Sequence, residues 1–135
     1  MRNLLLIEDV AAQRDLVAQV LHRREFAVTS VGDGRDGILH LQQQDFDAIL
    51  LDLRLPGCSG EFVVQWILAH RVHLRSRILI VTGDLSAPGL AYFHDQKIPV
   101  LQKPYSLEQL IKAVETIAAP RPEDASEVRS MARLG

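Results

Sequence analysis

Five side chains suited to ionic or nucleophilic chemistry follow short apolar runs of this sequence. They are Glu8, Asp9, Asp52, Thr82 and Lys103. Each has an ordinary explanation on its own, because an acid can cap a helix, a threonine is common in strands and a lysine is usually solvated. Four apolar runs that all end in this way indicate a shared site.

Three carboxylates in one place need a cation. Two of them about 4 Å apart repel by roughly 4 kcal/mol at an effective dielectric constant of about 20, and an all-oxygen ligand set suits Mg²⁺. The metal would also counter the charge of an incoming phosphoryl group, to which Thr82 could donate a hydrogen bond and Lys103 a positive charge. Asp52 then remains as the nucleophile that forms an acyl phosphate.

The elements that would position these side chains are short strands alternating with helices. Strands are expected at residues 4–7, 26–31, 48–51, 77–81 and 98–101, and helices at residues 10–23, 35–44, 61–70, 85–96 and 107–118. This alternation is typical of a parallel sheet covered on both faces, so the predicted fold class is α/β. In an open α/β sheet, ligands bind outside the carboxyl ends of the strands, which is where the five side chains fall.

Local signals refine three of the helices. Ser106 can cap the last one, at residues 107–118. Pro88 and Gly89 interrupt the helix expected at residues 85–96, which should therefore be short or irregular. The helix at residues 61–70 is expected to turn four large side chains inward: Phe62, Val63, Trp66 and Ile67.

Length and composition indicate one soluble domain. The 135 residues suffice for a single core, and the sequence turns polar at its end, so we expect a domain at residues 1–119 and a polar tail or linker at residues 120–135. A net charge of −2 gives no general attraction to nucleic acid or acidic lipid. The single cysteine, Cys58, suits a reducing compartment, and no apolar run approaches the roughly 20 residues of a membrane helix. A cytoplasmic location is expected.

From about Asn3 to Ala118 the chain resembles the receiver domain of two-component response regulators. The resemblance rests on the acid pair and on three segments: Leu51-Asp52-Leu53-Arg54-Leu55-Pro56-Gly57 with Gly60, Val81-Thr82-Gly83, and Lys103-Pro104-Tyr105. It implies a flavodoxin-like, doubly wound, five-stranded parallel sheet of order 2-1-3-4-5 with five helices, and a cis bond before Pro104. It also implies Mg²⁺ bound by Asp9, Asp52 and the backbone carbonyl of Arg54, with Glu8 acting through water.

The function implied by this resemblance is that of a phosphorelay switch. Asp52 would accept a phosphoryl group from a histidine kinase or histidine phosphotransfer protein in a Mg²⁺-dependent reaction, assisted by Thr82 and Lys103. Such a domain phosphorylates and dephosphorylates itself and is not a turnover enzyme. Its expected partners also include an output domain or downstream protein and a second copy in a phosphorylation-linked homodimer, whereas direct nucleic-acid binding and membrane insertion are not expected. The segments around Thr82 and Lys103 resemble those of receivers from hybrid histidine kinases.

Three features depart from the family pattern. Val100 stands where family members that switch by rotating an aromatic ring carry that ring. Arg54 and Asp84 each lie two residues after a site residue, and we hypothesise that they pair across the site and alter the lifetime of the acyl phosphate. The interrupted helix at residues 85–96 lies on the usual output surface of the family, so a partner different from the usual one is expected.

Two other functions remain open. A receiver-like module could bind partners without ever being phosphorylated, although the complete set of acids, hydroxyl and lysine argues against it. A phosphohydrolase with an aspartate nucleophile would usually carry a second aspartate two residues later, where this chain has Arg54. Catalytic turnover of small phosphate esters would support that third function.

Several other motifs have simpler structural explanations. Residues 32–37 spell G-x-G-x-x-G, but Asp33 and Asp36 would repel a pyrophosphate, so a turn into the next helix is the better interpretation. A basic cluster between residues 70 and 77 is interpreted as a solvated loop, not a metal or nucleic-acid site: His70, Arg71, His73, Arg75 and Arg77. Cys58 is interpreted as a loop residue whose thiol, if exposed, could oxidise.

Overall fold

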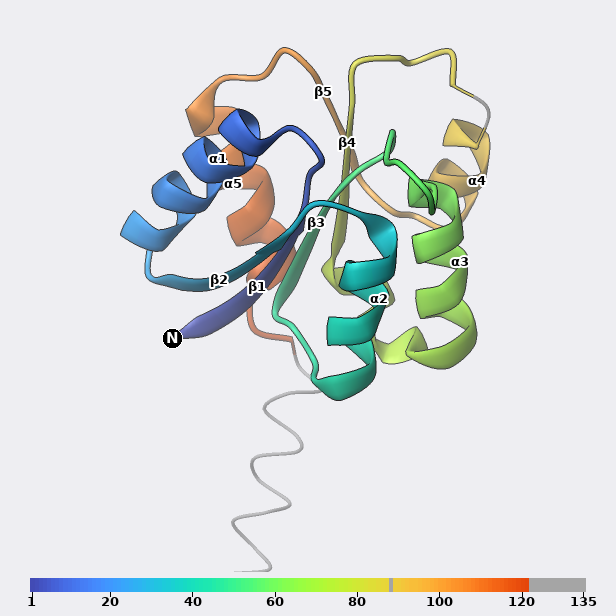
Figure 1. Ribbon diagram of the computed structural model, residues 1–135, viewed down its shortest axis with the longest axis horizontal. Helices are drawn as coiled ribbons and strands as arrows, with labels where there is room; N and C mark the ends of the chain where they lie inside the picture. The colour runs from blue at the N-terminus through green and yellow to red at the C-terminus, as the bar shows by residue number, and fades with distance from the viewer. Residues whose placement is uncertain (88, 122–135) are drawn as a thin grey trace, which may run out of the picture.

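The computed structural model describes residues 1–87 and 89–121, which form a sheet between two layers of helices (Figure 1). The strands are β1 (Arg2–Ile7), β2 (Phe26–Val31), β3 (Ala48–Asp52), β4 (Ile78–Thr82) and β5 (Val100–Gln102). They are parallel and lie in the predicted order β2-β1-β3-β4-β5. Residues 122–135, most of the expected tail, lie outside the described residues.

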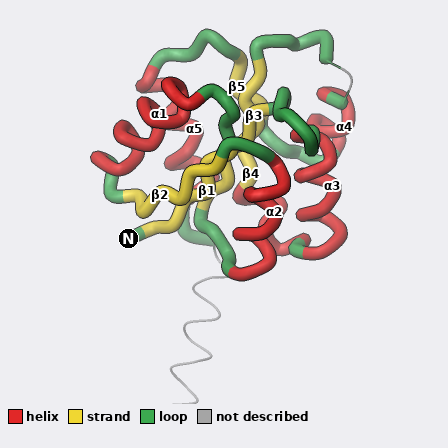
Figure 2. Tube along the Cα trace, viewed as in Figure 1, coloured by secondary structure: helices red, strands yellow, loops and turns green. Residues whose placement is uncertain are grey.

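The helices divide between the two faces of the sheet (Figure 2). They are α1 (Ala11–Arg23), α2 (Gly34–Gln43), α3 (Gly60–His70), α4 (Leu90–Asp95) and α5 (Leu107–Ala118), with a short 3-10 helix, η1 (Val72–Arg77), between α3 and β4. Helices α1 and α5 pack on one face, and α2, α3 and α4 on the other. No helix within the described residues is long and apolar enough to cross a membrane.

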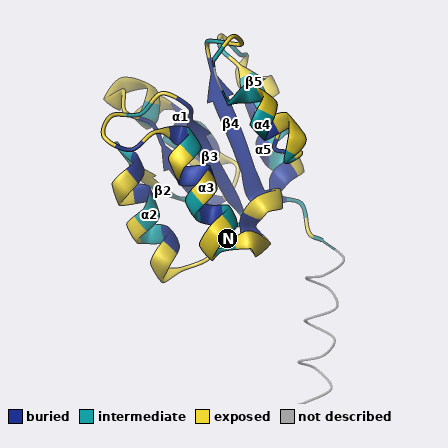
Figure 3. Cartoon of the chain, turned by 90° about the vertical axis from the view of Figure 1, so that its right-hand side faces the viewer, coloured by how far each residue is buried: buried dark blue, intermediate teal, exposed yellow. Residues whose placement is uncertain are grey.

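The central strands are buried on both faces, which explains their uninterrupted apolar sequences. Every residue of β3 and β4 is buried, and these strands are dark along their length in Figure 3. The edge strand β5 is shorter and begins later than predicted. Pro99 lacks the N–H that a strand residue would donate, but its carbonyl still accepts a hydrogen bond from the Ile80 N–H at 3.0 Å.

Side-chain caps fix the starts of three helices. Asp33, Ser59 and Ser106 accept hydrogen bonds from the backbone N–H of Asp36, Phe62 and Gln109, respectively. Ser106 also takes part in a complete capping box, which confirms its predicted role. Helix α4 has only six residues and starts after Gly89, whose φ of 102° is readily adopted only by glycine, so the prediction of a short helix is also confirmed.

The predicted inward position of Phe62 is wrong. Its exposed fraction is 52%, whereas Val63, Val64 and Ile67 form the buried stripe of α3 and Trp66 packs partly against the core. Phe62 lies one residue away from that stripe and therefore points along the surface between α2 and α3. Similarly, Leu16, Leu39 and Leu107 are exposed at the margins of otherwise apolar helix faces.

The basic segment at residues 70–77 is less solvated than predicted. Arg77 is buried, and its guanidinium donates to the carbonyls of Ile117 and Ala119 at 3.1 and 2.9 Å. Arg71 and His73 both pair with Asp45, an acid that the fold brings from the loop between α2 and β3. These contacts join segments more than 25 residues apart, so local sequence could not predict them.

We expect Gly60→Ala to lower the free energy of unfolding by about 1–2 kcal/mol, since overpacking typically costs about 1–3 kcal/mol and a lost glycine recovers part of it. A Cβ at Gly60 would lie 2.8 Å from the Leu53 carbonyl oxygen and 3.0 Å from that of Asp52, and backbone atoms cannot easily move aside. Urea denaturation measures the change. In the control, Gly83→Ala, the added Cβ would lie 3.9 Å from the Lys103 Cβ, an ordinary contact distance, and an equal loss there would contradict the steric explanation.

Candidate functional site

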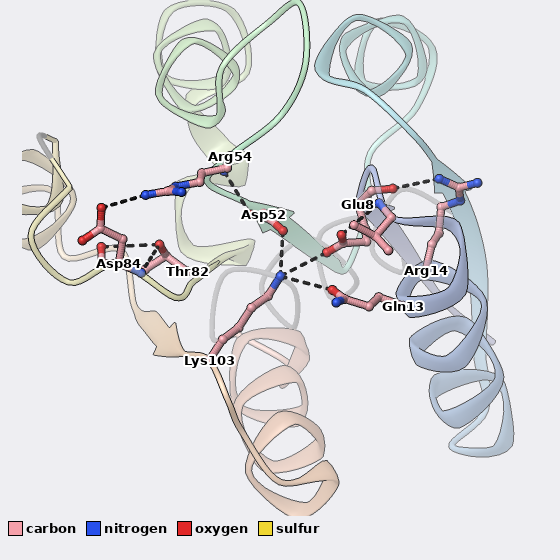
Figure 4. A network of polar contacts seen from close by, with 9 residues as sticks. Glu8, Gln13, Arg14, Asp52, Arg54, Thr82, Asp84 and Lys103 are labelled. Atoms are coloured by element: carbon pink, nitrogen blue, oxygen red, sulfur yellow. Dashed lines mark hydrogen bonds and ion pairs between the residues drawn. The ribbon is translucent and has the colours of Figure 1, made fainter.

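The three predicted carboxylates meet at the carboxyl edge of the sheet, and Figure 4 shows two of them, Glu8 and Asp52. Glu8 and Asp9 follow β1, and Asp52 ends the neighbouring strand β3. One oxygen from each carboxylate lies within 4.8 Å of the others. Asp9 is exposed, whereas Glu8 and Asp52 are 6% and 8% exposed. The cluster therefore combines two largely desolvated acids with one acid open to solvent.

Asp52 lies in a pocket of about 320 Å³ with polar groups on both of its carboxylate oxygens. Its Oδ1 accepts a hydrogen bond from the Arg54 N–H at 2.9 Å. Its Oδ2 lies 2.8 Å from the Lys103 ammonium. The pocket is lined by Asp9, Asp52, Arg54, Thr82, Gly83, Asp84 and Lys103. All five side chains predicted from sequence thus lie in or beside one small space.

Lys103 reaches the carboxylates from the loop after β5. The backbone N–H of Lys103 donates to the Thr82 carbonyl at 2.8 Å, and the peptide bond between Lys103 and Pro104 is cis, as the resemblance implied. The ammonium lies 3.5 Å from Glu8 Oε2 and 3.4 Å from Gln13 Oε1, in addition to its closer contact with Asp52. Burial lowers the pKa of Lys103, but the hydrogen bond and charge of Asp52 outweigh it, so the pKa lies above its usual value.

Glu8 is the acid whose environment changes its ionisation most. Burial, with smaller contributions from Asp52, raises the pKa of Glu8 to about 7. The Val10 N–H, which donates to Glu8 Oε1 at 3.1 Å, and the Lys103 ammonium act in the opposite direction. A cation in the cluster would favour the ionised form, so proton and metal binding should compete at this carboxyl group.

Thr82 and Asp84 form the opposite wall of the pocket. Thr82 is buried, and its Oγ1 accepts a hydrogen bond from the Asp84 N–H at 3.1 Å. Arg54 and Asp84 pair at 2.9 Å, which confirms the predicted contact between them. Hydrogen bonds from Ser86, and then the contact with Arg54, hold the pKa of the Asp84 carboxyl below its usual value. Val100, at the position where some family members carry an aromatic ring, is partly buried and packs against the core.

Two residues of the first turns of α1 take part in the network but were not predicted. Gln13 accepts from Lys103, and Arg14 donates from Nη1 to the Glu8 carbonyl at 2.9 Å. The sequence feature that could have identified them is their position, four and five residues after Asp9, at the start of the helix that follows the acids. Polar residues there can reach back to the loop, although spacing alone does not identify their partners.

The alternative motifs are accounted for by local structure. Asp33 caps α2 within the glycine-rich segment, which follows the edge strand β2 and so makes the predicted turn. Gly34 allows α2 to approach Cys58, since a Cβ there would lie 2.7 Å from the Cys58 carbonyl oxygen. Cys58 itself is buried, and burial raises the pKa of its thiol, so the exposed thiol considered from the sequence is not found.

Several curated proteins are similar in sequence to most of the chain. Sensory transduction protein RegX3 of Mycolicibacterium smegmatis is 31% identical over 121 residues, which are 87% of this chain and 50% of that protein. Transcriptional regulatory protein CutR of Streptomyces coelicolor is 31% identical over 117 residues, 85% of this chain and 52% of CutR. The chain therefore spans about half the length of the curated relatives it matches.

Solved structures show the same fold. The receiver domain of the sensor histidine kinase PA1611 from Pseudomonas aeruginosa, solved with a magnesium ion in its active-site cleft, has a TM-score of 0.78 at 24% identity. That alignment covers 88% of this chain and 98% of the PA1611 domain. The non-phosphorylated HemR receiver domain from Leptospira biflexa has a TM-score of 0.81 at 21% identity, with 90% of this chain and 98% of HemR covered.

A family profile also matches most of the sequence. The profile described as the response regulator receiver domain matches residues 4–115. That range contains both acids of the pair, Asp52, Thr82 and Lys103, together with every strand from Leu4 onward. The chain therefore belongs to the response regulator receiver domain family.

Proposed function

We propose that the chain is a phosphorylation-controlled switch in which Asp52 accepts a phosphoryl group from a phosphohistidine. The observation that best supports this is the contact between Lys103 Nζ and Asp52 Oδ2, at 2.8 Å, beside two more carboxylates and a buried threonine. Histidine kinases or histidine phosphotransfer proteins are the proposed donors. Residues 120–135 are proposed to link this domain to an output domain or to end as a tail.

The donor set fits Mg²⁺. Three carboxylates within 4.8 Å of one another form a hard, anionic oxygen site, and such oxygen ligands suit this ion. Asp9, Asp52 and the backbone carbonyl of Arg54 would hold the ion directly, and Glu8 through water. When bound, the ion supplies positive charge for the oxygens of the transferring phosphoryl group. The magnesium in the cleft of the PA1611 receiver domain supports the same assignment.

The residues of the chain would act mainly by position and charge. An Asp52 oxygen attacks phosphorus, and its new P–O bond forms as the P–N bond of the donor breaks. The donor imidazole, which carries a proton on its other ring nitrogen before transfer, keeps the electron pair of the P–N bond and leaves as a neutral ring. The Lys103 ammonium, already directed at Asp52, would stay with the transferred group, and the Thr82 hydroxyl would turn from Asp84 to donate to a phosphoryl oxygen. Hydrolysis of the acyl phosphate would return the domain to its starting state.

An apolar groove beside Lys103 supports docking of a donor protein. The groove, of about 390 Å³, lies between α1 and the loop before α5, and Leu16 and Leu107 are exposed on it. It is lined by Gln13, Leu16, Val17, Lys103, Pro104, Tyr105 and Leu107. A helix that packs an apolar face there would bring a histidine beside it close to the pocket of Asp52.

The proposed function is tested by phosphate incorporation from acetyl phosphate, measured by mass spectrometry of the intact chain. We expect one phosphate on the wild-type chain with Mg²⁺, mapped to Asp52, and none after chelation of the metal or in Asp52→Asn. Incorporation that persists in Asp52→Asn would contradict the assignment of the nucleophile. A wild-type chain that takes up no phosphate would favour a receiver-like module that only binds partners.

We further expect Arg54→Ala and Asp84→Ala to shorten the lifetime of the acyl phosphate by about threefold to tenfold each, because their ion pair closes one side of the pocket to water. The double variant should match the single ones, since both remove the same contact. The Arg54 side chain is 77% exposed, and water screens such a surface pair, so stability should change little. Phosphate release after removal of acetyl phosphate measures the rate.

Ser86→Ala is the matched control for this pair. It removes the hydroxyl that donates to Asp84 Oδ1 at 2.6 Å and leaves the contact between Arg54 and Asp84 in place. Its dephosphorylation rate should stay closer to that of the wild-type chain. Unchanged rates in both Arg54→Ala and Asp84→Ala would rule out a role for the ion pair.

A further inference from the structure

The segment that carries two of the three carboxylates is held mainly by backbone contacts. It consists of Glu8, Asp9 and Val10, between β1 and α1. The Glu8 N–H donates to the Val31 carbonyl at 3.1 Å, and the Val10 N–H donates to the Glu8 side chain. Val10 occupies the N-cap of α1, and no side chain among the described residues caps this helix. The usual polar anchor at a helix start is therefore missing here.

Arg14 provides a different anchor for this segment. Arg14 lies on α1, just after the acids, and its guanidinium donates a hydrogen bond to the Glu8 carbonyl at 2.9 Å. Figure 4 shows it approaching Glu8 from the side opposite Lys103. The backbone at Glu8 is thus held by Val31 through its N–H and by Arg14 through its carbonyl, and Asp9 follows directly.

The guanidinium is also confined by the loop after β2. A Cβ placed on Gly32 would lie 3.1 Å from Arg14 Nη1, which means that the guanidinium lies against the glycine backbone. A larger residue at position 32 would require the guanidinium to shift by a few tenths of an ångström from its place beside the Glu8 carbonyl. Gly32 and Arg14 therefore form a matched pair across the segment that carries the acids.

Charge alone would not place an arginine here. A guanidinium beside a cation site repels the cation, so its removal should tighten metal binding by up to about threefold at these separations in water. Loss of a group that fixes a metal ligand has the opposite sign and typically weakens binding by about 10–100-fold. The two effects therefore predict changes of opposite direction.

We propose that Arg14, held against Gly32, is a positioning residue that fixes the backbone of Glu8 and thereby the placement of Asp9 for Mg²⁺. This inference rests on the proposed function, because it assigns Arg14 to the metal site of that reaction. It gives the first turn of α1 a role in assembling the site. It also makes the loop after the edge strand β2 part of the support of the site, although none of its side chains lines the pocket of Asp52.

The test is Mg²⁺ affinity measured by isothermal titration, with urea denaturation of the metal-free chain as a check on folding. Arg14→Met keeps most of the side chain but removes the donor, and we expect it to bind Mg²⁺ about tenfold more weakly. Arg14→Lys keeps the charge without the planar fork and should restore only part of the affinity. Arg23→Met, which removes an exposed positive charge from the far end of α1, should bind like the wild-type chain.

Gly32→Ala tests the same idea while keeping Arg14. We expect it to weaken Mg²⁺ binding in the same direction, and the double variant with Arg14→Met to be no weaker than Arg14→Met alone. Unchanged or tighter binding in Arg14→Met, with a folded chain, would overturn the proposal. A wild-type chain that binds no Mg²⁺, or binds it equally well as Asp52→Asn, would instead reject the proposed function.

Discussion

Replacing Lys103 by methionine is expected to slow phosphoryl incorporation from acetyl phosphate by roughly 10²–10³-fold, the cost typical of losing one preorganised charged or hydrogen-bonding group. The ammonium lies 2.8 Å from Asp52 Oδ2 and is held between Asp52, Glu8 and Gln13 before any phosphoryl group arrives. It therefore needs little rearrangement to follow the transferred charge. The rate should be measured at saturating Mg²⁺, so that metal affinity does not limit it.

The same variant should bind Mg²⁺ more tightly. Without Lys103 the three carboxylates lose their nearest positive charge, and the metal no longer competes with an ammonium for Asp52. Lys112→Met, which removes an exposed lysine from α5, is the matched control and should change neither quantity. Normal phosphorylation of Lys103→Met would show that Mg²⁺ alone neutralises the transferred group.

Without Mg²⁺, the chain is expected to lose stability as pH rises from about 4.5 to about 7. The pKa of Glu8 is about 7 in the folded chain against an ordinary value of 4.5, so the folded state binds more protons throughout that interval. The contribution of Glu8 is therefore fully present below pH 4.5 and is lost as pH rises through 7. A shift of this size corresponds to at most about 3–4 kcal/mol, and solvent around the carboxyl group screens the interaction, so the expected loss is smaller.

Urea denaturation across this pH range measures the effect of Glu8. We expect Glu8→Gln to flatten the decline, because glutamine stays neutral, and saturating Mg²⁺ to reduce it, because the metal stabilises the carboxylate. Glu115→Gln, at a surface ion pair with Arg2, should keep the wild-type slope. A slope that persists in Glu8→Gln would assign the titration to another group.

The sheet and the acids at its edge could be predicted from the sequence, because both follow from local sequence patterns. β1, β3 and β4 each contain an uninterrupted apolar run, at residues 4–7, 48–51 and 78–81, and burial on both faces requires that composition. Glu8 and Asp52 come immediately after or at the end of such runs, so the parallel topology alone brings them together. The pairing of Arg54 with Asp84 was also predictable, since each follows a neighbouring strand by the same short distance.

Contacts made by helix faces and distant loops could not be predicted in this way. The hydrogen bond from Arg14 to Glu8 depends on how α1 is rotated, and the bonds from Arg77 depend on where α5 ends against η1. Phe62 shows the same limit, because an apolar residue at helical spacing can fall just outside the buried stripe. Local periodicity gives the number of apolar positions, whereas the neighbouring elements decide which of them are covered.

Because Cys58 is buried, the reactivity of its thiol can report local opening of the loop that contains it. Cys58 is the only cysteine in the sequence, its thiol lies against Gly34, and burial raises its pKa. A thiol reagent can therefore react quickly only when the loop after β3 separates from the start of α2. The rate of thiol labelling would then measure how often this opening occurs in the unmodified wild-type chain. A change in that rate on phosphorylation of Asp52 would report a structural change a few residues from the phosphoryl group, without an engineered probe.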